Sequence, residues 1–265
     1  MPGELDTHGE LRAALADDDL SLVFQPEYDL TVDDIVAVEA LVRWAHPERG
    51  DVEPSEFVRL AEESGLIHEL GSWVLETALT EFTVWGAQLP DLDVVLRLNV
   101  AIAQLTEAGF VDTLATALDR HVVDAEHVCI EITESSPRWD AARLADSIRG
   151  MRALGVQVAI DDLANGYSTL GMLRDHPIDV VKIDRALVTG VDTDPRASKI
   201  LAALVRLAED LGVTVVAEGI ETPGERAEVV RLGCRRGQGY LMSLPVPGRE
   251  VVRLLAEHGR RSQHV

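Results

Sequence analysis

Short apolar segments that end in a polar side chain, most often a carboxylate, recur along this chain of 265 residues. The polar ends are Glu39, Asn99, Glu131, the pair Asp161 and Asp162, Lys182, Glu218 and Gln238. The interiors of these segments are rich in Val, Ile and Leu, as in buried strands, where a carboxylate without a partner is very costly. A parallel barrel gathers the carboxyl ends of its strands at one face, where enzymes of this fold carry out their chemistry. The pattern therefore predicts that these side chains converge on one site.

Strand and helix patterns alternate with short connections, which is typical of βα units and a parallel sheet. The predicted strands are 20–25, 35–43, 94–100, 128–133, 157–161, 180–184, 214–218 and 237–241. Helical patterns include 54–64, 67–85, 140–154 and 198–211, and Thr222-Pro-Gly-Glu225 is a capping box that begins another helix. The segment before Leu20 is expected to form a short helix that closes the bottom of the barrel. Eight strands in this length predict an α/β fold with a single (β/α)8 TIM-like barrel.

A doubly wound open sheet is the alternative fold. It is disfavoured because no glycine-rich phosphate-binding loop follows any of the predicted strands.

Composition and charge narrow the class of protein. A formal net charge of −22 argues against binding to duplex nucleic acid, because such proteins need a basic surface. No apolar run reaches about 18 residues, so no membrane span is expected. The acidic, polar N-terminus is unlike a signal peptide, and Cys129 and Cys234 do not form a CxxC pattern. These features predict a reduced protein of the cytoplasm.

The carboxylates and the amide at the strand ends are hard oxygen donors, which Mg²⁺ and Mn²⁺ prefer. The adjacent Asp161 and Asp162 could each reach a different ion, and a two-metal site suits hydrolysis of a phosphate ester. A single strand-end carboxylate is more often a helix cap or a surface ion pair, and Lys182 alone could be an internal counter-charge. The coincidence on most strands favours a metal-dependent phosphate-ester hydrolase. A Schiff-base aldolase that uses Lys182 is an alternative.

Several short motifs occur in a fixed order: Phe24-Gln-Pro26, Glu39-Ala-Leu41, Leu98-Asn-Val100, Glu131-Ile-Thr-Glu134, Asp161-Asp162, Val181-Lys-Ile-Asp184, Ala217-Glu-Gly-Ile-Glu221 and Gln238-Gly-Tyr240. Their order and spacing resemble those of EAL domains, the cyclic di-GMP phosphodiesterases. The resemblance runs through nearly the whole chain. It implies a single EAL domain over residues 1–265, with a core at about 10–258, in which the first barrel strand can run antiparallel.

The resemblance also implies a role for each matching position. Two Mg²⁺ or Mn²⁺ ions would be held by Glu39, Asn99, Glu131, Asp161, Asp162 and Glu218. Water activation would use Glu218 as general base, Lys182 to orient the water and Gln238 to complete the hydrogen-bond shell. Cyclic di-GMP would be bound by Gln25 and Arg43, whose forked guanidinium suits phosphate oxygens.

The loop after Asp162 is the main departure from the family pattern. In EAL domains Glu134 and Glu221 would hold this loop, although ordinary ion pairs are an alternative for both. Leu163 and Ala164 replace the usual Phe and Gly there. Because the loop couples metal binding to the dimer interface in the family, a catalytically weak or inactive receptor for cyclic di-GMP is the alternative function.

Arg97 is a second departure, at a position that is normally small. It shares strand parity with Asn99, so we expect it to point into the barrel and to pair with a carboxylate. Among partners, the resemblance implies a homodimer, and sensor or GGDEF domains elsewhere in the parent system.

Overall fold

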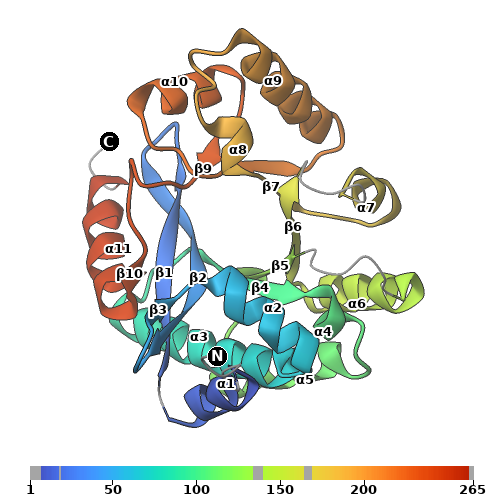
Figure 1. Ribbon diagram of the computed structural model, residues 1–265. Coiled ribbons are helices and arrows are strands. Elements are labelled where there is room, and N and C mark those ends of the chain that lie inside the picture. The colour runs from blue at the N-terminus through green and yellow to red at the C-terminus, as the bar shows by residue number, and fades with distance from the viewer. Residues whose placement is uncertain (1–6, 18, 134–139, 164–168, 263–265) are drawn as a thin grey trace, which may run out of the picture.

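Ten strands form one sheet in the computed structural model, which describes residues 7–17, 19–133, 140–163 and 169–262, and eight of these strands close into a barrel (Figure 1). The strands are β1 (Leu20–Asp29), β2 (Asp34–His46), β3 (Gly50–Val52), β4 (Val95–Ala101), β5 (Val128–Thr133), β6 (Gln157–Leu163), β7 (Val180–Ile183), β8 (Thr214–Ala217), β9 (Arg236–Gly237) and β10 (Val246–Pro247). The α/β barrel expected from the sequence is confirmed.

Helices surround the barrel (Figure 1). They are α1 (Thr7–Ala16), α2 (Pro54–Ser64), α3 (Ile67–Gln88), α4 (Ile102–Leu105), α5 (Phe110–His121), α6 (Ala141–Leu154), α7 (Thr169–Asp175), α8 (Arg185–Val188), α9 (Pro195–Asp210), α10 (Pro223–Arg231) and α11 (Gly248–Ser262), with a 3-10 turn η1 (Ala125–His127) before β5. None of the helices in the described residues is long and apolar enough to cross a membrane.

The strand β1 runs antiparallel to both of its neighbours, β2 and β9, and so closes the barrel. All other neighbouring strands of the barrel pair in parallel, in the order β2, β4, β5, β6, β7, β8 and β9. The remaining strands, β3 and β10, lie outside the closed ring and pair with β2 and β1. The antiparallel first strand expected from the resemblance is therefore confirmed.

Local sequence signals determine where the helices begin and end. The predicted capping box starts α10, where Thr222 Oγ1 accepts from the Glu225 amide at 3.1 Å and Glu225 Oε2 accepts from the Thr222 amide at 3.0 Å. Asp140 caps α6 by accepting the amides of Ala142 and Arg143. Gly155 ends α6 in the left-handed region at φ 96°, which favours glycine.

The last predicted strand, 237–241, is much shorter in the structure, because β9 ends at Gly237. Beyond it, Gln238 donates its amide to the Ala217 carbonyl, and the chain then turns at Gly239. A Cβ atom at Gly239 would lie 2.2 Å from the carbonyl oxygen of Ile220, so only glycine permits this close approach. The strand pattern in the sequence does not reveal that the backbones of two loops touch here.

The predicted helix before β1 exists, but its expected place at the bottom of the barrel was wrong. Leu11 and Ala14 of α1 pack in one apolar cluster with Trp44 and Phe57, and α1 contacts α2 and α3. The reason is the direction of β1. Its first residue, Leu20, pairs with Trp44 near the carboxyl end of β2, so α1 lies beside that end of the barrel.

The barrel interior has an apolar layer near the amino ends of its strands, in which Cys129, Ala159, Val180 and Val216 pack together with Val95 against them. Because side chains alternate along a strand, the residues two positions further on point to the same side. These residues are Arg97, Glu131, Asp161, Lys182 and Glu218. The strand period therefore places charged side chains directly above the apolar layer.

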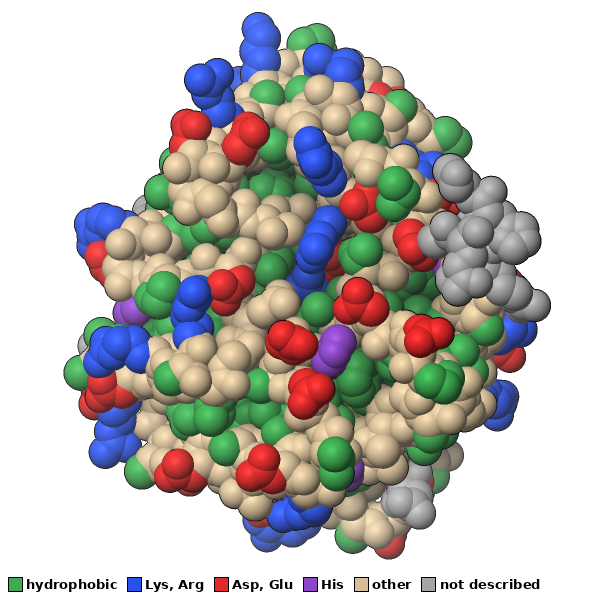
Figure 2. All heavy atoms as spheres, turned by 180° about the vertical axis from the view of Figure 1, so that it is seen from behind, with side chains coloured by type: hydrophobic (Ala, Val, Ile, Leu, Met, Phe, Trp, Pro, Cys, Tyr) green, Lys and Arg blue, Asp and Glu red, His purple; other side chains and the backbone are tan. Residues whose placement is uncertain are grey.

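The net charge of −22 is distributed over a mixed surface. Figure 2 shows acidic and basic side chains scattered singly or in small groups over one face of the molecule, between apolar ones.

Candidate active site

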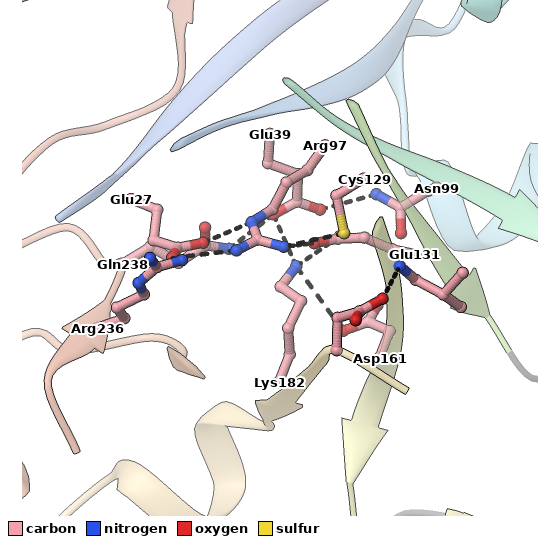
Figure 3. A network of polar contacts seen from close by, with 12 residues as sticks. Glu27, Glu39, Arg97, Asn99, Cys129, Glu131, Asp161, Lys182, Arg236 and Gln238 are labelled. Carbon is pink, nitrogen blue, oxygen red and sulfur yellow. Dashed lines mark hydrogen bonds and ion pairs between the residues drawn. The ribbon is translucent and has the colours of Figure 1, made fainter. Parts of the chain in front are cut away.

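Lys182 on β7 lies among four carboxylates that come from four different strands or strand ends (Figure 3). Its Nζ is 2.7 Å from Glu218 Oε1, 2.8 Å from Glu131 Oε2, 2.9 Å from Glu39 Oε2 and 3.8 Å from Asp161 Oδ1. The lysine side chain is only 1% exposed, so these charges interact with little screening by water. One ammonium does not balance four carboxylates, and the cluster can carry excess negative charge.

Two amide side chains join the carboxylates to one another. Gln238 Nε2 donates to Glu39 Oε2 at 2.7 Å and to Glu218 Oε1 at 2.9 Å. Asn99 Nδ2 donates to Glu39 Oε1 at 2.7 Å. Gln25 lies directly opposite Glu39 in the β1–β2 ladder, and its Nε2 is 3.5 Å from the Ser243 carbonyl. The structure thus brings most of the predicted site residues together.

Burial and the shared lysine shift the pKa values of this cluster. Burial by itself would raise the pKa of Glu39, but Lys182 and the hydrogen bonds from Gln238 and Asn99 lower that pKa to about 2. Burial raises the pKa of Glu131 well above its ordinary value, against the opposing effect of Lys182. Burial also raises the pKa of Glu218, to about 8.

The ammonium of Lys182 is held in its charged form. Burial by itself would lower the pKa of Lys182, but Glu131, Glu218 and Glu39 raise it well above the ordinary value. The site therefore combines one strongly retained cation with carboxylates of different proton affinity.

Divalent cations fit the donor set, although the described residues contain no group of three or more His, Cys, Asp or Glu already arranged around a common ion position. The carboxylates instead converge on the Lys182 ammonium. Two buried oxygens at the site, Glu131 Oε1 and Gln238 Oε1, have no hydrogen-bond partner. Hard oxygen donors with excess negative charge and unpaired lone pairs are suited to Mg²⁺ or Mn²⁺.

The other predicted site residues lie around this cluster or outside the described part. Arg43 lies four positions after Glu39 on β2, hence on the same side of the strand, and its Nη1 donates to the Val42 carbonyl at 2.8 Å. Glu221 forms an ion pair with Arg185 of α8 at 2.8 Å. The side chains of Asp162 and Leu163 lie outside the described residues, as do Glu134 and Ala164 entirely.

A buried ion pair below the carboxylates involves Arg97, which points into the barrel as expected (Figure 3). Its Nε and Nη2 donate to Glu27 Oε2 at 2.6 Å and Glu27 Oε1 at 3.2 Å. Sequence reasoning missed Glu27, because the predicted strand 20–25 ends before it, whereas β1 continues to Asp29. The available signal was parity, since Glu27 lies two residues after Gln25 on β1.

Glu225 is a second residue whose full role was missed. It was predicted as part of the capping box, but its Oε1 also accepts the Gly190 amide at 2.9 Å, and its Oε2 accepts the Glu221 amide at 2.9 Å. One carboxylate thereby ties the connection after β7 to the loop that follows Glu218. No local pattern predicts the contact with Gly190, which is 35 positions away.

Comparisons with known proteins agree with this fold. A family model described as EAL domain matches residues 8–245. An uncharacterized protein of Mycobacterium tuberculosis is 40% identical over 97% of this chain and 41% of its own length. The bifunctional diguanylate cyclase/cyclic di-GMP phosphodiesterase MucR of Pseudomonas aeruginosa is 35% identical over 93% of this chain and 36% of its own length. The chain thus spans about two fifths of the length of these curated relatives.

Solved structures show the same fold. The MucR phosphodiesterase in complex with c-di-GMP has a TM-score of 0.86 and 35% identity, covering 93% of this chain and 100% of that one. The EAL enzyme Bd1971, in a form with cAMP and cyclic di-GMP bound, has a TM-score of 0.90 and 30% identity, covering 95% of this chain and 68% of that one.

Proposed function

This chain belongs to the EAL domain family, and we propose that it is a metal-dependent phosphodiesterase that hydrolyses cyclic di-GMP to linear 5'-pGpG. The observation that carries the proposal is the convergence of Glu39, Glu131, Asp161 and Glu218 on Lys182 at the carboxyl ends of the barrel strands. The c-di-GMP complex of MucR supports the choice of substrate.

The ligand set of the proposed metal site follows the side chains of the cluster. Glu39, Asn99, Glu131 and Asp161 would hold one Mg²⁺ or Mn²⁺ ion, and Asp161, Asp162 and Glu218 would hold a second. Such ions, when bound, supply stabilisation of charge on the phosphate and lower the pKa of a bound water.

Three side chains around the reacting phosphate would accept the proton, provide positive charge and position the carboxylates. Glu218 would accept a proton from the attacking water, because burial raises its pKa and so makes its carboxylate a stronger base. Lys182 retains its proton and provides positive charge beside the phosphate, while its Nζ holds Glu218 Oε1 in place. Gln238 fixes Glu39 and Glu218 with one amide nitrogen.

Substrate contacts are assigned to Gln25 and Arg43. Gln25 is buried beside Glu39, where its amide can reach a nucleotide. Arg43 is half-buried on the same side of β2, and its forked guanidinium suits phosphate oxygens. The assignment of Glu134 and Glu221 to the loop after Asp162 stays a prediction.

The Schiff-base alternative is disfavoured by the state of Lys182. A nucleophilic amine must be neutral, and the surrounding carboxylates raise the pKa of this lysine well above its ordinary value. The receptor alternative depends on the loop that contains Leu163 and Ala164, so it is decided by turnover measurements.

The test is to incubate the protein with cyclic di-GMP and Mg²⁺ or Mn²⁺, to separate the products by chromatography, and to run a chelator control alongside. We expect pGpG to form with the metal and to disappear with the chelator. If the protein binds cyclic di-GMP but forms no product, its function is that of a receptor rather than an enzyme. If the protein neither forms product nor binds cyclic di-GMP, both functions are contradicted.

The assembly proposed with this function is a homodimer, as implied by the family resemblance, and sensor or GGDEF domains are expected in the parent system. Light scattering of the purified chain tests the dimer. The cytoplasm stays the expected compartment, because cyclic di-GMP is a bacterial second messenger.

A further inference from the structure

We propose that Arg97 is a positioning residue for the metal site. Arg97 holds the metal ligand Glu131 from below and is itself held by a buried ion pair with Glu27. This inference rests on the proposed function. It assigns a role to Arg97, one of the positions where this sequence departs from the EAL pattern.

Arg97 divides its guanidinium between two carboxylates. Its Nε and Nη2 face Glu27, while its Nη1 lies 3.7 Å from Glu131 Oε1 and 3.2 Å from Cys129 Sγ. Arg97, Glu27 and Glu131 are all 0% exposed. Figure 3 shows the guanidinium between Glu27 on one side and Cys129 and Glu131 on the other. The contact with Glu131 is therefore built into the closed interior of the barrel.

Glu131 is consequently held between two cations, one at each oxygen. Lys182 Nζ donates to its Oε2 at 2.8 Å, and Arg97 approaches its Oε1. Arg97 attracts Oε1 across this distance without a hydrogen bond. The lone pairs of Oε1 therefore remain available for a cation. A carboxylate fixed in this way loses little conformational entropy when it binds an ion, and outer partners of this kind orient metal ligands.

The pairing of Arg97 with Glu27 explains how a cation can lie this close to a divalent metal site. A lone arginine would repel the ions, but Glu27 neutralises it at 2.6 Å, and Arg236 lies 3.8 Å from the same carboxylate. Small side chains in the layer below, among them Cys129 and Ala159, leave room for the guanidinium. The pair can thus orient Glu131 without opposing the binding of Mg²⁺ or Mn²⁺.

The experiment measures Mn²⁺ binding to the full chain by electron paramagnetic resonance titration, without substrate. The double variant Glu27→Gln/Arg97→Met removes both charges together and leaves no unpaired buried ion. We expect its dissociation constant for Mn²⁺ to rise about 10- to 100-fold, the usual cost of losing an outer partner of a metal ligand. The control Arg236→Met removes the other cation near Glu27 without touching Glu131, and should change the constant less than about twofold.

A second variant guards against a folding defect in the first. Arg97→Lys keeps a cation for Glu27 but has no fork to reach Glu131 as well, and we expect a rise of at least about fivefold in the Mn²⁺ dissociation constant. In both variants, saturating Mn²⁺ should restore hydrolysis with an unchanged KM for cyclic di-GMP, which a general packing defect would not allow.

The outcomes separate this inference from the proposed function. If the wild type binds Mn²⁺ and Glu131→Gln weakens binding, but both Arg97 variants bind within about twofold of the wild type, the pair is structural only and the inference is wrong. If the wild type itself binds no Mn²⁺, the proposed function fails first.

Discussion

Two groups of charged side chains lie in the barrel interior, a lower layer around Glu27 and Arg97 and an upper layer around Lys182, and they differ in charge balance. In the lower layer, Glu27 faces the guanidinium of Arg97 at 2.6 Å, with Arg236 nearby at 3.8 Å. In the upper layer, the single ammonium of Lys182 faces Glu39, Glu131, Asp161 and Glu218. The lower layer is therefore compensated within the protein, whereas the upper layer is compensated only in part.

This difference separates a structural role from a functional one. A buried ion pair with matched partners is costly to break but has no charge left to offer a ligand. A cluster with an excess of carboxylates is costly to maintain unless a further cation binds, and perturbed pKa values of this kind are concentrated at functional sites. The upper layer thus attracts cations, and the lower layer supports it.

The largest expected effect is on catalysis, in the upper layer. Glu39→Ala removes the carboxylate that receives hydrogen bonds from Lys182, Gln238 and Asn99, and we expect hydrolysis of cyclic di-GMP to fall by at least about a thousandfold. Product formation in saturating Mn²⁺ measures the effect. The control Glu48→Ala changes an exposed glutamate after the same strand and should hydrolyse like the wild type. Turnover near the wild-type rate in Glu39→Ala would rule out the assigned metal site.

The next effect concerns stability, in the lower layer. Arg97→Ala leaves Glu27 buried with only the more distant Arg236, and we expect the free energy of unfolding to fall by about 3–5 kcal/mol. Urea denaturation with and without Mn²⁺ measures it, and Mn²⁺ should not restore the loss. The control Arg152→Ala breaks a partly exposed pair with Asp179 and should cost at most about 1 kcal/mol. Equal costs for the two variants would contradict a costly buried ion pair in the lower layer.

A smaller effect is expected when the cation of the upper layer is removed. Lys182→Met should reduce hydrolysis on the order of a hundredfold, because the water and phosphate lose a positioned charge. The carboxylates then lack their internal counter-charge, so Mn²⁺ should raise the melting temperature of this variant more than that of the wild type. Thermal melts in chelator and in Mn²⁺ measure this, with the exposed Lys199→Met, the other lysine of the chain, as control. If Mn²⁺ raises the melting temperature of Lys182→Met and of the wild type equally, the carboxylates of the upper layer are not partly compensated by Lys182.

The smallest effect involves a carboxylate satisfied by amides rather than by cations. Burial by itself raises the pKa of Glu225, but hydrogen bonds from Gly190, Glu221 and Thr222 lower it below its ordinary value of 4.5. The charged form therefore contributes stability above pH 4.5, and this contribution is lost as the pH falls through the folded-state pKa. Glu225→Gln should cost about 1–2 kcal/mol at neutral pH. Unfolding curves from pH 7 downward should converge with those of the wild type, and a constant gap would contradict the pKa shift.

Much of the fold and of the site follows from strand parity in the sequence. Once Glu131 and Lys182 are placed at the ends of parallel strands, their convergence follows from the geometry of a barrel. The inward direction of Arg97 follows from its spacing to Asn99. These inferences need only local periodicity and the direction of the chain, and both are readable from the residues.

Features that depend on contacts between distant segments could not be predicted in this way. Glu27 and Arg97 are 70 positions apart, and neither sequence neighbourhood identifies the partner. The early end of β9 depends on the approach of Gly239 to Ile220 in another loop. The place of α1 depends on the reversed direction of β1, which the residues of the helix itself do not encode.

The ladder between β1 and β2 has a consequence for how two parts of the site are aligned. Gln25 pairs with Glu39, and Glu27 lies on the same face of β1, just before a bulge at Tyr28. A slip of β1 by one residue would turn both side chains out of the barrel together, because the side-chain period of a strand is two. Substrate contact and support for Arg97 would then be lost in a single step. The register of β1 therefore sets the substrate contact and the support for Arg97 together, and neither can be changed alone by moving this strand.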